Sequence, residues 1–288
     1  MDKLIDHNGR IIPLEDARLS PGQAGLLLGW GVFTTLQLCQ GHPFEFGSHY
    51  KRMARDAKRL NVPLEISEAL LLKRVIDLAH ENQRADGMAR VSIVRNSGGS
   101  WGGGRSDSPA DSLIFTQPMP SWPAFYRLQV QPGAVFSSGA LAGAKMLSWA
   151  PNSSFMERAR AAGCDDALLL NEFGRVAECT SANIFVVRGG KISTPPLSSG
   201  CLPGVTREIL LRIAPEAGLP MAEEEISVEM LDGADELFIS STTRAVGAVR
   251  EIAGRREYPV GGGITRAVKS AFGKYLESRL SVRESGAR

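Results

Sequence analysis

Lys145 stands in an apolar run of the sequence, between Ala142-Gly143-Ala144 and Met146-Leu147. A lysine forms an imine with an aldehyde only while its amine is uncharged, and a poorly hydrated setting favours the uncharged amine. Lys145 is therefore a candidate nucleophile for chemistry on a carbonyl compound. The alternative is a solvated lysine at a strand end, which is where most lysines lie.

Two further segments carry groups that suit an anionic, aromatic ligand. Residues 165–185 predict a strand, a tight turn and a returning strand, in which Glu178 precedes the small polar run Cys179-Thr180-Ser181. Residues 202–207, Leu-Pro-Gly-Val-Thr-Arg, then open a helix. Free N–H groups at a helix start, joined by a hydroxyl, bind phosphate well, although many such starts are only loops that enter helices.

The run from Lys145 to residue 250 resembles the class IV aminotransferases, the family of branched-chain aminotransferase, D-amino acid aminotransferase and aminodeoxychorismate lyase. It is similar to their order of Lys, then G-x-x-x-A-L-L-L-x-x-x-G-x-V-x-E-x-x-x-x-N-I-F, then T-P, then L-P-G-x-T-R. Residues 49–53, His-Tyr-Lys-Arg-Met, resemble the family's H-x-x-R-L. The resemblance implies an α+β, two-domain fold-type IV enzyme, with an N-terminal α/β sandwich and a C-terminal pseudo-barrel of strands flanked by helices.

The resemblance also implies the cofactor, pyridoxal 5'-phosphate, and the residues that bind it. Lys145 would carry it as a Schiff base, and Glu178 would hold its pyridine nitrogen protonated. The phosphate would lie against the cofactor-binding residues Arg52, Val205, Thr206, Ser241 and Thr242. In the last pair, Ser241 replaces the family's usual glycine, so Thr242 is the firmer member.

The resemblance implies an aminotransferase that moves an amino group between a small amino acid, branched-chain-like or D-, and a 2-oxo acid. Several features favour the lyase instead, which forms 4-aminobenzoate and pyruvate. Phe33-Thr34-Thr35 resembles the lyase's F-T-T, where branched-chain enzymes have F-E-G, and Glu178-Cys179-Thr180 resembles its E-C-T. A third alternative is an inert protein that only binds the cofactor or another phosphate ester.

Arg95 and Arg105 are the candidates for binding the substrate carboxylate, because both flank a glycine-rich stretch at 98–104 and arginine offers a fork of donors. An exposed loop arginine is an equally good description of each. A second glycine run, Gly261-Gly262-Gly263, lacks the spacing of a P-loop or a dinucleotide site, and it predicts a loop.

The positions of these residues depend on the strands and helices expected around them. Hydrophobic patterns predict strands and helices whose limits are as follows. The strands are residues 32–38, 44–46, 89–95, 112–116, 134–137, 166–170, 184–187, 236–239 and 245–252. The helices are one capped by Ser48, one from the Ser67 cap towards Gln83, and residues 154–162, 205–217 and 264–280.

Composition limits the remaining possibilities. The chain has 288 residues, 43% of them hydrophobic, and 33 basic against 31 acidic residues, which is ordinary for a globular protein and offers no footprint for nucleic acid. No apolar run approaches the roughly 18 residues of a membrane span, and the scattered cysteines predict reduced thiols and no metal site. We expect domains at 1–117 and 125–288 joined by a proline-rich linker at 118–124, a cytoplasmic location and a homodimer.

Overall fold

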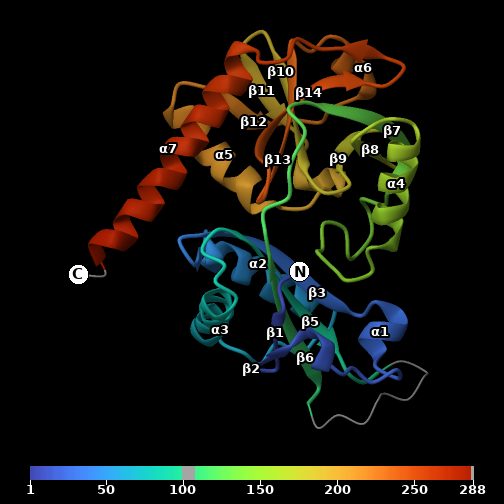
Figure 1. Cartoon of the computed structure of the whole chain (residues 1–288). Coiled ribbons are helices and arrows are strands. Elements are labelled where there is room, and N and C mark those ends of the chain that lie inside the picture. The colour runs from blue at the N-terminus through green and yellow to red at the C-terminus, as the bar shows by residue number, and fades with distance from the viewer. Residues whose placement is uncertain (99–107, 287–288) are drawn as a thin grey trace. The chain divides into compact units, whose positions relative to one another are not determined.

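The computed structural model describes residues 1–98 and 108–286, and it contains two compact units (Figure 1). The first unit comprises Met1–Ser121 with Ala144–Trp149, and the second comprises Trp122–Gly143 with Ala150–Arg288. The domain limits drawn from the sequence stay a prediction. They assign Lys145 to the C-terminal domain, whereas in the structure its segment packs with the first unit.

The first unit is an antiparallel sheet covered on one face by two helices. Its strands are β1 (Leu4–His7), β2 (Arg10–Pro13), β3 (Gly31–Cys39), β4 (His42–Pro43), β5 (Gly87–Arg95) and β6 (Ala110–Gln117), in the order β2-β1-β6-β5-β3-β4. Its helices are η1 (Leu14–Asp16), α1 (Ala24–Leu28), α2 (Phe46–Arg59) and α3 (Glu68–Glu81). Alternate residues of β3, including Leu36 and Leu38, pack against α2 and α3, so Phe33 and Thr35 lie on the opposite face of the strand.

The second unit is a curled sheet of nine strands flanked by helices (Figure 1). Its strands are β7 (Tyr126–Val135), β8 (Asp166–Asn171), β9 (Val176–Cys179), β10 (Asn183–Arg188), β11 (Lys191–Thr194), β12 (Met221–Glu223), β13 (Glu236–Ser241), β14 (Ala245–Ile252) and β15 (Arg256–Glu257). Their order is β12-β11-β10-β13-β14-β7-β8-β9, with β15 beside β14. The helices are α4 (Ala150–Ala161), η2 (Leu197–Ser199), α5 (Val205–Glu216), α6 (Val228–Asp232) and α7 (Gly263–Gly286).

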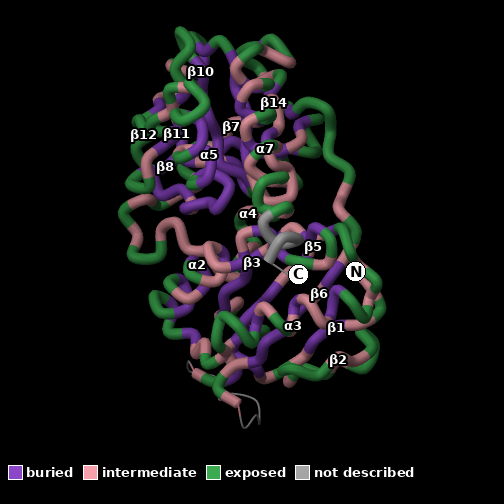
Figure 2. Tube along the Cα trace, turned by 90° about the vertical axis from the view of Figure 1, so that its left-hand side faces the viewer, coloured by how far each residue is buried: buried purple, intermediate pink, exposed green. Residues whose placement is uncertain are grey.

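Strands β8 and β10 lie in the core of the second unit (Figure 2). Their apolar runs are continuous rather than alternating, which is typical of strands buried on both faces. On one face Leu168, Ile184 and Ile239 share a cluster, and on the other Phe185 stacks on Phe238 of β13 at 4.7 Å between ring centroids. This packing makes the ends of the strands rigid. The polar residues of the site lie at these strand ends.

The predicted α+β fold, with an N-terminal sandwich and a C-terminal half-barrel, is confirmed. Most elements lie where the sequence places them, and Ser67 caps α3 through the N–H of Leu70. Three local predictions are wrong. The strand expected at 44–46 is missing because β4 ends at Pro43 and α2 begins at Phe46, so Glu45 rather than Ser48 is its N-cap. The strand expected at 134–137 belongs to the longer β7.

The four cysteines, all in the described ranges, are buried free thiols. Across residues 1–98 and 108–286, no helix combines the length and the apolar character needed to cross a bilayer.

Candidate active site

Lys145 lies on a short segment that extends the sheet of the first unit along the edge of β3. The Phe33 N–H donates to the carbonyl of Lys145 at 3.2 Å, and the Leu147 N–H donates to the carbonyl of Gly31 at 2.9 Å. Gly31 permits this close approach, because a Cβ there would lie 2.4 Å from Leu147 Cδ1 and from the carbonyl of Ile93. The backbone of Lys145 is therefore fixed by pairing with a buried strand.

Two aromatic rings surround the Lys145 amine. Nζ lies 4.5 Å from the centroid of Phe33 and 4.8 Å from that of Trp149, and these rings meet edge to face at 5.5 Å. On the backbone side, the Lys145 N–H donates to the buried carboxylate of Asp56 at 3.0 Å. Because Asp56 lies one turn after Arg52 on α2, the lysine segment is tied to the helix that carries that arginine.

Arg52 belongs to a buried chain of hydrogen bonds on the helix side of β3. Its Nη2 donates to Thr34 Oγ1 at 3.0 Å, and Thr34 Oγ1 lies 2.8 Å from Nδ1 of His49. Burial lowers the pKa of His49 well below its ordinary value, and the charges of Arg52 and Lys145 lower it further. A neutral His49 ring nitrogen accepts a hydrogen bond from the Thr34 hydroxyl, and the Thr34 oxygen in turn accepts a hydrogen bond from the Arg52 guanidinium.

Glu178 is the penultimate residue of β9 in the second unit, and its carboxylate is held by the segment that leads into α5. Oε2 accepts the N–H of Leu202 at 3.1 Å and lies 3.4 Å from the Asn183 amide nitrogen, which also donates to the Leu202 carbonyl at 2.9 Å. Asn183 lies so close to Gly204 that a Cβ there would come within 2.1 Å of its Oδ1. Only glycine allows this arrangement.

The start of α5 supplies backbone donors. Within the described part of the chain, no side chain caps this helix at its N-cap, Gly204, and the first-turn residues Val205 and Thr206 are both buried. The first N–H groups of a helix have no partner inside it, and they carry the positive end of its dipole. This terminus therefore suits an anion.

The turn after β13 lies beside the same groups. Ser240 pairs with Asn183 across the antiparallel strands β10 and β13, and Ser241 pairs with Ala245 at the start of β14. The second unit thus brings together five predicted cofactor contacts, which are Glu178, Val205, Thr206, Ser241 and Thr242. Their donor set, a helix start with hydroxyls beside an oriented carboxylate, fits a phosphorylated pyridine.

The predicted substrate arginines have different surroundings. Arg95 donates through Nε to the Ser97 carbonyl at 2.6 Å and through Nη1 to the Asn61 carbonyl, with its guanidinium 4.3 Å from the Trp30 centroid. Arg105 lies outside the described residues.

Arg90 is an arginine that the sequence patterns did not single out. It lies on β5 with its guanidinium 3.8 Å from the centroid of Phe33, the ring that also borders the Lys145 amine. Burial lowers the pKa of Arg90. The Phe33 ring therefore borders both the Lys145 amine and the Arg90 guanidinium.

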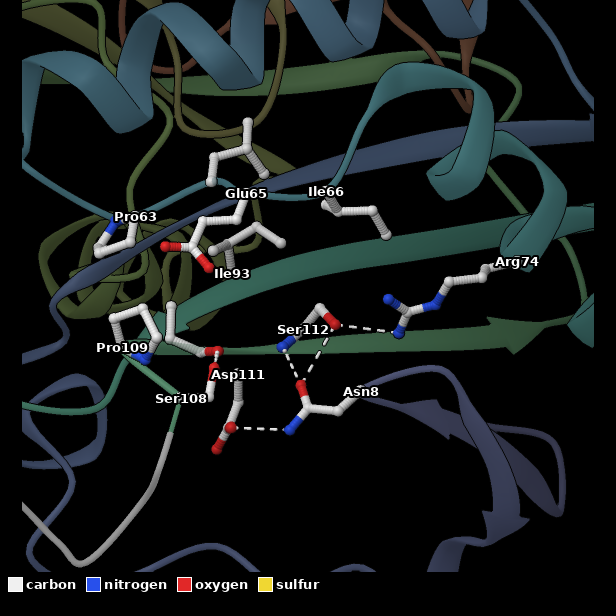
Figure 3. Close-up of a pocket in the computed structure, with 12 residues that line it drawn as sticks. Asn8, Pro63, Glu65, Ile66, Arg74, Ile93, Ser108, Pro109, Asp111 and Ser112 are labelled. Atoms are coloured by element: carbon white, nitrogen blue, oxygen red, sulfur yellow. Dashed lines mark hydrogen bonds between the residues drawn. The ribbon is translucent and has the colours of Figure 1, made fainter.

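A separate cavity of about 270 Å³ lies in the first unit (Figure 3). Its polar groups bond to one another, because Arg74 donates to Ser112 Oγ at 2.9 Å and Asn8 joins Ser112 to Asp111. None of the predicted site residues lines it. These bonds join α3 and the turn after β1 to β6, and they give the cavity a structural explanation.

The sequence pattern described as amino-transferase class IV matches residues 31–252 of the chain. The chain belongs to the class IV aminotransferase family. This family consists of enzymes that depend on pyridoxal phosphate, and a branched-chain member 25% identical to this chain was solved with pyridoxamine 5'-phosphate. The predicted family, enzyme class and cofactor are confirmed.

Similar class IV aminotransferases cover almost the whole chain. The putative branched-chain-amino-acid aminotransferase of Methanocaldococcus jannaschii is 29% identical over 86% of this chain and 87% of its own. The D-alanine aminotransferase of Staphylococcus epidermidis is 27% identical over 94% and 97%. The branched-chain aminotransferase of Thermoproteus uzoniensis, solved with norvaline, is 27% identical with a TM-score of 0.86, covering 96% of this chain and 95% of that one.

Proposed function

We propose that the chain is a pyridoxal-phosphate-dependent aminotransferase that moves an amino group between a small amino acid, branched-chain or D-, and a 2-oxo acid. The observation that carries the proposal is the Lys145 amine, held between Phe33 and Trp149 on a segment fixed to β3. When bound, the cofactor withdraws the electron pair that remains at the substrate Cα after its proton leaves.

Lys145 would hold the cofactor covalently. Its amine, once freed by the substrate amine, would move a proton from the substrate Cα to the cofactor carbon that carried the imine, and would move a proton in the opposite direction in the second half-reaction. Its backbone bonds to Phe33 and to Asp56 keep this amine in place during both steps.

Glu178 keeps the ring nitrogen protonated. Its carboxylate is already oriented by the Leu202 N–H, so no reorganisation is needed when the cofactor binds. The phosphate is bound by the N–H groups of Val205 and Thr206, the hydroxyls of Thr206, Ser241 and Thr242, and the guanidinium of Arg52.

The substrate carboxylate is bound by an arginine, and Arg90 is the best-placed candidate because it shares the Phe33 ring with Lys145. Arg95 and Arg105 stay predictions for the same role. Arg90→Ala is expected to raise the Michaelis constant of the amino donor about tenfold or more, as expected for the loss of a charge-assisted pair. A constant that rises in Arg95→Ala and not in Arg90→Ala would return the role to Arg95.

The decisive experiment is borohydride reduction of the yellow holoenzyme, followed by peptide mapping. The label is expected on Lys145, and Lys145→Ala is expected to lose the label and at least about a thousandfold of the turnover. Lys191→Ala, which changes an exposed lysine on β11, is the matched control. Label on another lysine would contradict the proposal.

The substrate class follows from the donor that bleaches the cofactor absorbance in a single half-reaction. The loss of cofactor absorbance is measured with L-branched-chain amino acids, with D-alanine and with L-glutamate. Pyruvate release is measured in parallel with aminodeoxychorismate as the substrate. The lyase stays the second candidate because Thr34, at the position where branched-chain enzymes have an acid, bonds to His49 and Arg52. A yellow protein that is inert towards all four would favour the binding-only alternative.

The assembly is a homodimer in this proposal, supported by three consecutive leucines of α1. Leu26, Leu27 and Leu28 are 59%, 51% and 48% exposed, which is costly unless a second copy covers them. Leu27→Glu is expected to shift sedimentation to the monomer, and Leu70→Glu, at 51% exposure on α3, is the control. We also propose a cytoplasmic location, which cell fractionation tests.

A further inference from the structure

Asp166 is a fully buried carboxylate at the start of β8, in the second unit. It accepts the N–H of Ala167 at 2.8 Å, the N–H of Thr180 at 3.1 Å, the Thr180 hydroxyl, and the Ser181 hydroxyl at 3.1 Å. Its pKa is raised by burial, while Arg244 and the hydroxyls of Thr180 and Ser181 act in the opposite direction. A buried carboxylate with so many donors fixes every group that bonds to it.

Arg244 connects Asp166 to a second turn. Its Nη2 lies 3.6 Å from Asp166 Oδ2, and its Nη1 donates to the Ser181 carbonyl at 3.3 Å. The guanidinium is also stacked over Trp122 at 4.2 Å, whose indole N–H donates to the Thr243 carbonyl at 2.9 Å. Because its side chain is only 5% exposed, Arg244 connects groups inside the protein and is not a surface cation.

The two turns joined in this way are the ones that carry proposed cofactor contacts. Thr180 and Ser181 follow Glu178 at the end of β9, and Arg244 follows Ser241 and Thr242 at the end of β13. Neither strand is the neighbour of the other in the sheet, because β9 lies at its edge and β13 pairs with β10 and β14. The turn after β9 leads into β10, whose Asn183 pairs with Ser240 of β13, and Asp166 and Arg244 add side-chain bonds between the same two turns.

We propose that Asp166, acting through Arg244, is a positioning residue that holds the Glu178 strand end and the Ser241–Thr242 turn at the spacing one cofactor needs. The inference rests on the proposed function, since it takes those residues as the ones that bind the pyridine nitrogen and the phosphate. Asp166 itself touches no ligand in this scheme, because its oxygens are taken by the protein's own donors.

The test uses Asp166→Asn, which keeps the shape of the side chain and turns one of its two acceptor atoms into a donor. Cofactor affinity of the apoprotein is expected to fall on the order of 10- to 100-fold, as for other residues that orient ligand-binding groups. Amide hydrogen exchange is expected to quicken at both 178–183 and 240–245 together. Borohydride labelling at Lys145 is expected to persist at saturating cofactor.

Arg244→Lys keeps the charge and loses the planar fork, so it is the second variant if Asp166→Asn fails to fold. It is expected to loosen the same two segments. Glu236→Gln is the matched control, because it changes another buried carboxylate of the second unit that caps α7 instead. It is expected to lower the melting temperature with unchanged cofactor affinity.

The outcomes separate this inference from the proposed function. Wild-type affinity in both variants, or exchange that quickens in one turn alone, would overturn the role of Asp166. If exchange quickens in both turns of the variants but the wild-type protein never binds pyridoxal phosphate, the role of Asp166 stands and the proposed function is overturned.

Discussion

Helices α5 and α7 of the second unit both begin after glycine, and their N-termini have different partners within the chain. At α7 the Glu236 carboxylate accepts the N–H groups of Ile264 at 3.1 Å and Thr265 at 2.8 Å, so the chain itself supplies the anion. At α5 the neighbouring side chain is the Asn183 amide, which bonds to Leu202 and lies beside Glu178 instead of capping the helix.

Strand β13 carries residues that lie near both helix starts. Glu236 is its first residue and caps α7, and Ser241 is its last residue and lies near the start of α5. Each glycine also faces its own partner, since a Cβ on Gly262 would meet the Glu236 carboxyl carbon at 2.0 Å and one on Gly204 would meet Asn183 Oδ1 at 2.1 Å. Of these two glycine-led helix starts, that of α5 has no side-chain cap in the described residues, so it is the one that we propose binds phosphate.

Gly204→Ala is expected to have the largest effect. The added methyl group displaces Asn183 and with it the orientation of Glu178, so kcat/KM is expected to fall about a hundredfold or more. Gly262→Ala is the matched control, which disturbs Glu236 and α7 and is expected to reduce stability with little change in kcat/KM. Equal losses of activity in both variants would remove the functional distinction between the two helices.

Inorganic phosphate is expected to stabilise the apoprotein through α5 alone. At a hundredfold excess over its dissociation constant, a ligand adds about 2.7 kcal/mol to the free energy of unfolding, which raises the melting temperature. The rise is expected to persist in Glu236→Gln and to disappear in Gly204→Ala. A phosphate response that Glu236→Gln alone enhances would place the anion at α7.

Glu236→Gln is expected to cost about 2 kcal/mol of unfolding free energy, because one buried N–H at the start of α7 loses its acceptor and the helix dipole loses its counter-charge. Urea unfolding of the apoprotein measures this loss. Turnover of the holoenzyme is expected to stay unchanged, and a variant that unfolds normally but turns over slowly would contradict the purely structural role.

Some elements of the fold can be predicted from local sequence pattern, and others depend on residues that are distant in the sequence. Strands with continuous apolar runs, such as Asp166–Asn171, and the start of α5 follow from local pattern and are confirmed. The strand expected from the sequence omits the first half of β7, although Tyr126, Leu128 and Val130 alternate there with polar residues as in a half-buried strand. Its partners β8 and β14 are distant in sequence.

Site residues are hidden for the same reason. Arg90 occupies a polar position of an alternating strand, which suggests a solvent-facing side chain until Phe33 of the neighbouring strand is placed beside it. The capping of α7 by Glu236 likewise joins residues that no motif connects. Motif spacing alone argues against a phosphate site at Gly261-Gly262-Gly263, and the packing of Glu236 against it supplies the physical reason.

The smallest expected effect concerns His49 in the first unit, a buried side chain whose hydrogen-bond partner, Thr34, belongs to the chain itself. Its pKa is held well below the ordinary 6.5 by burial, so the folded protein keeps it neutral while the unfolded chain takes up a proton below pH 6.5. Unfolding then binds an extra proton, and stability falls as pH falls from 6.5 towards the lowered pKa. Between pH 6.5 and 5.5 this amounts to about 1 kcal/mol. In His49→Gln, whose amide oxygen still accepts the Thr34 hydroxyl, urea unfolding of the apoprotein is expected to lose that part of the pH dependence. An identical slope in both proteins would mean that His49 titrates normally and that the Thr34 bond does not require a neutral ring.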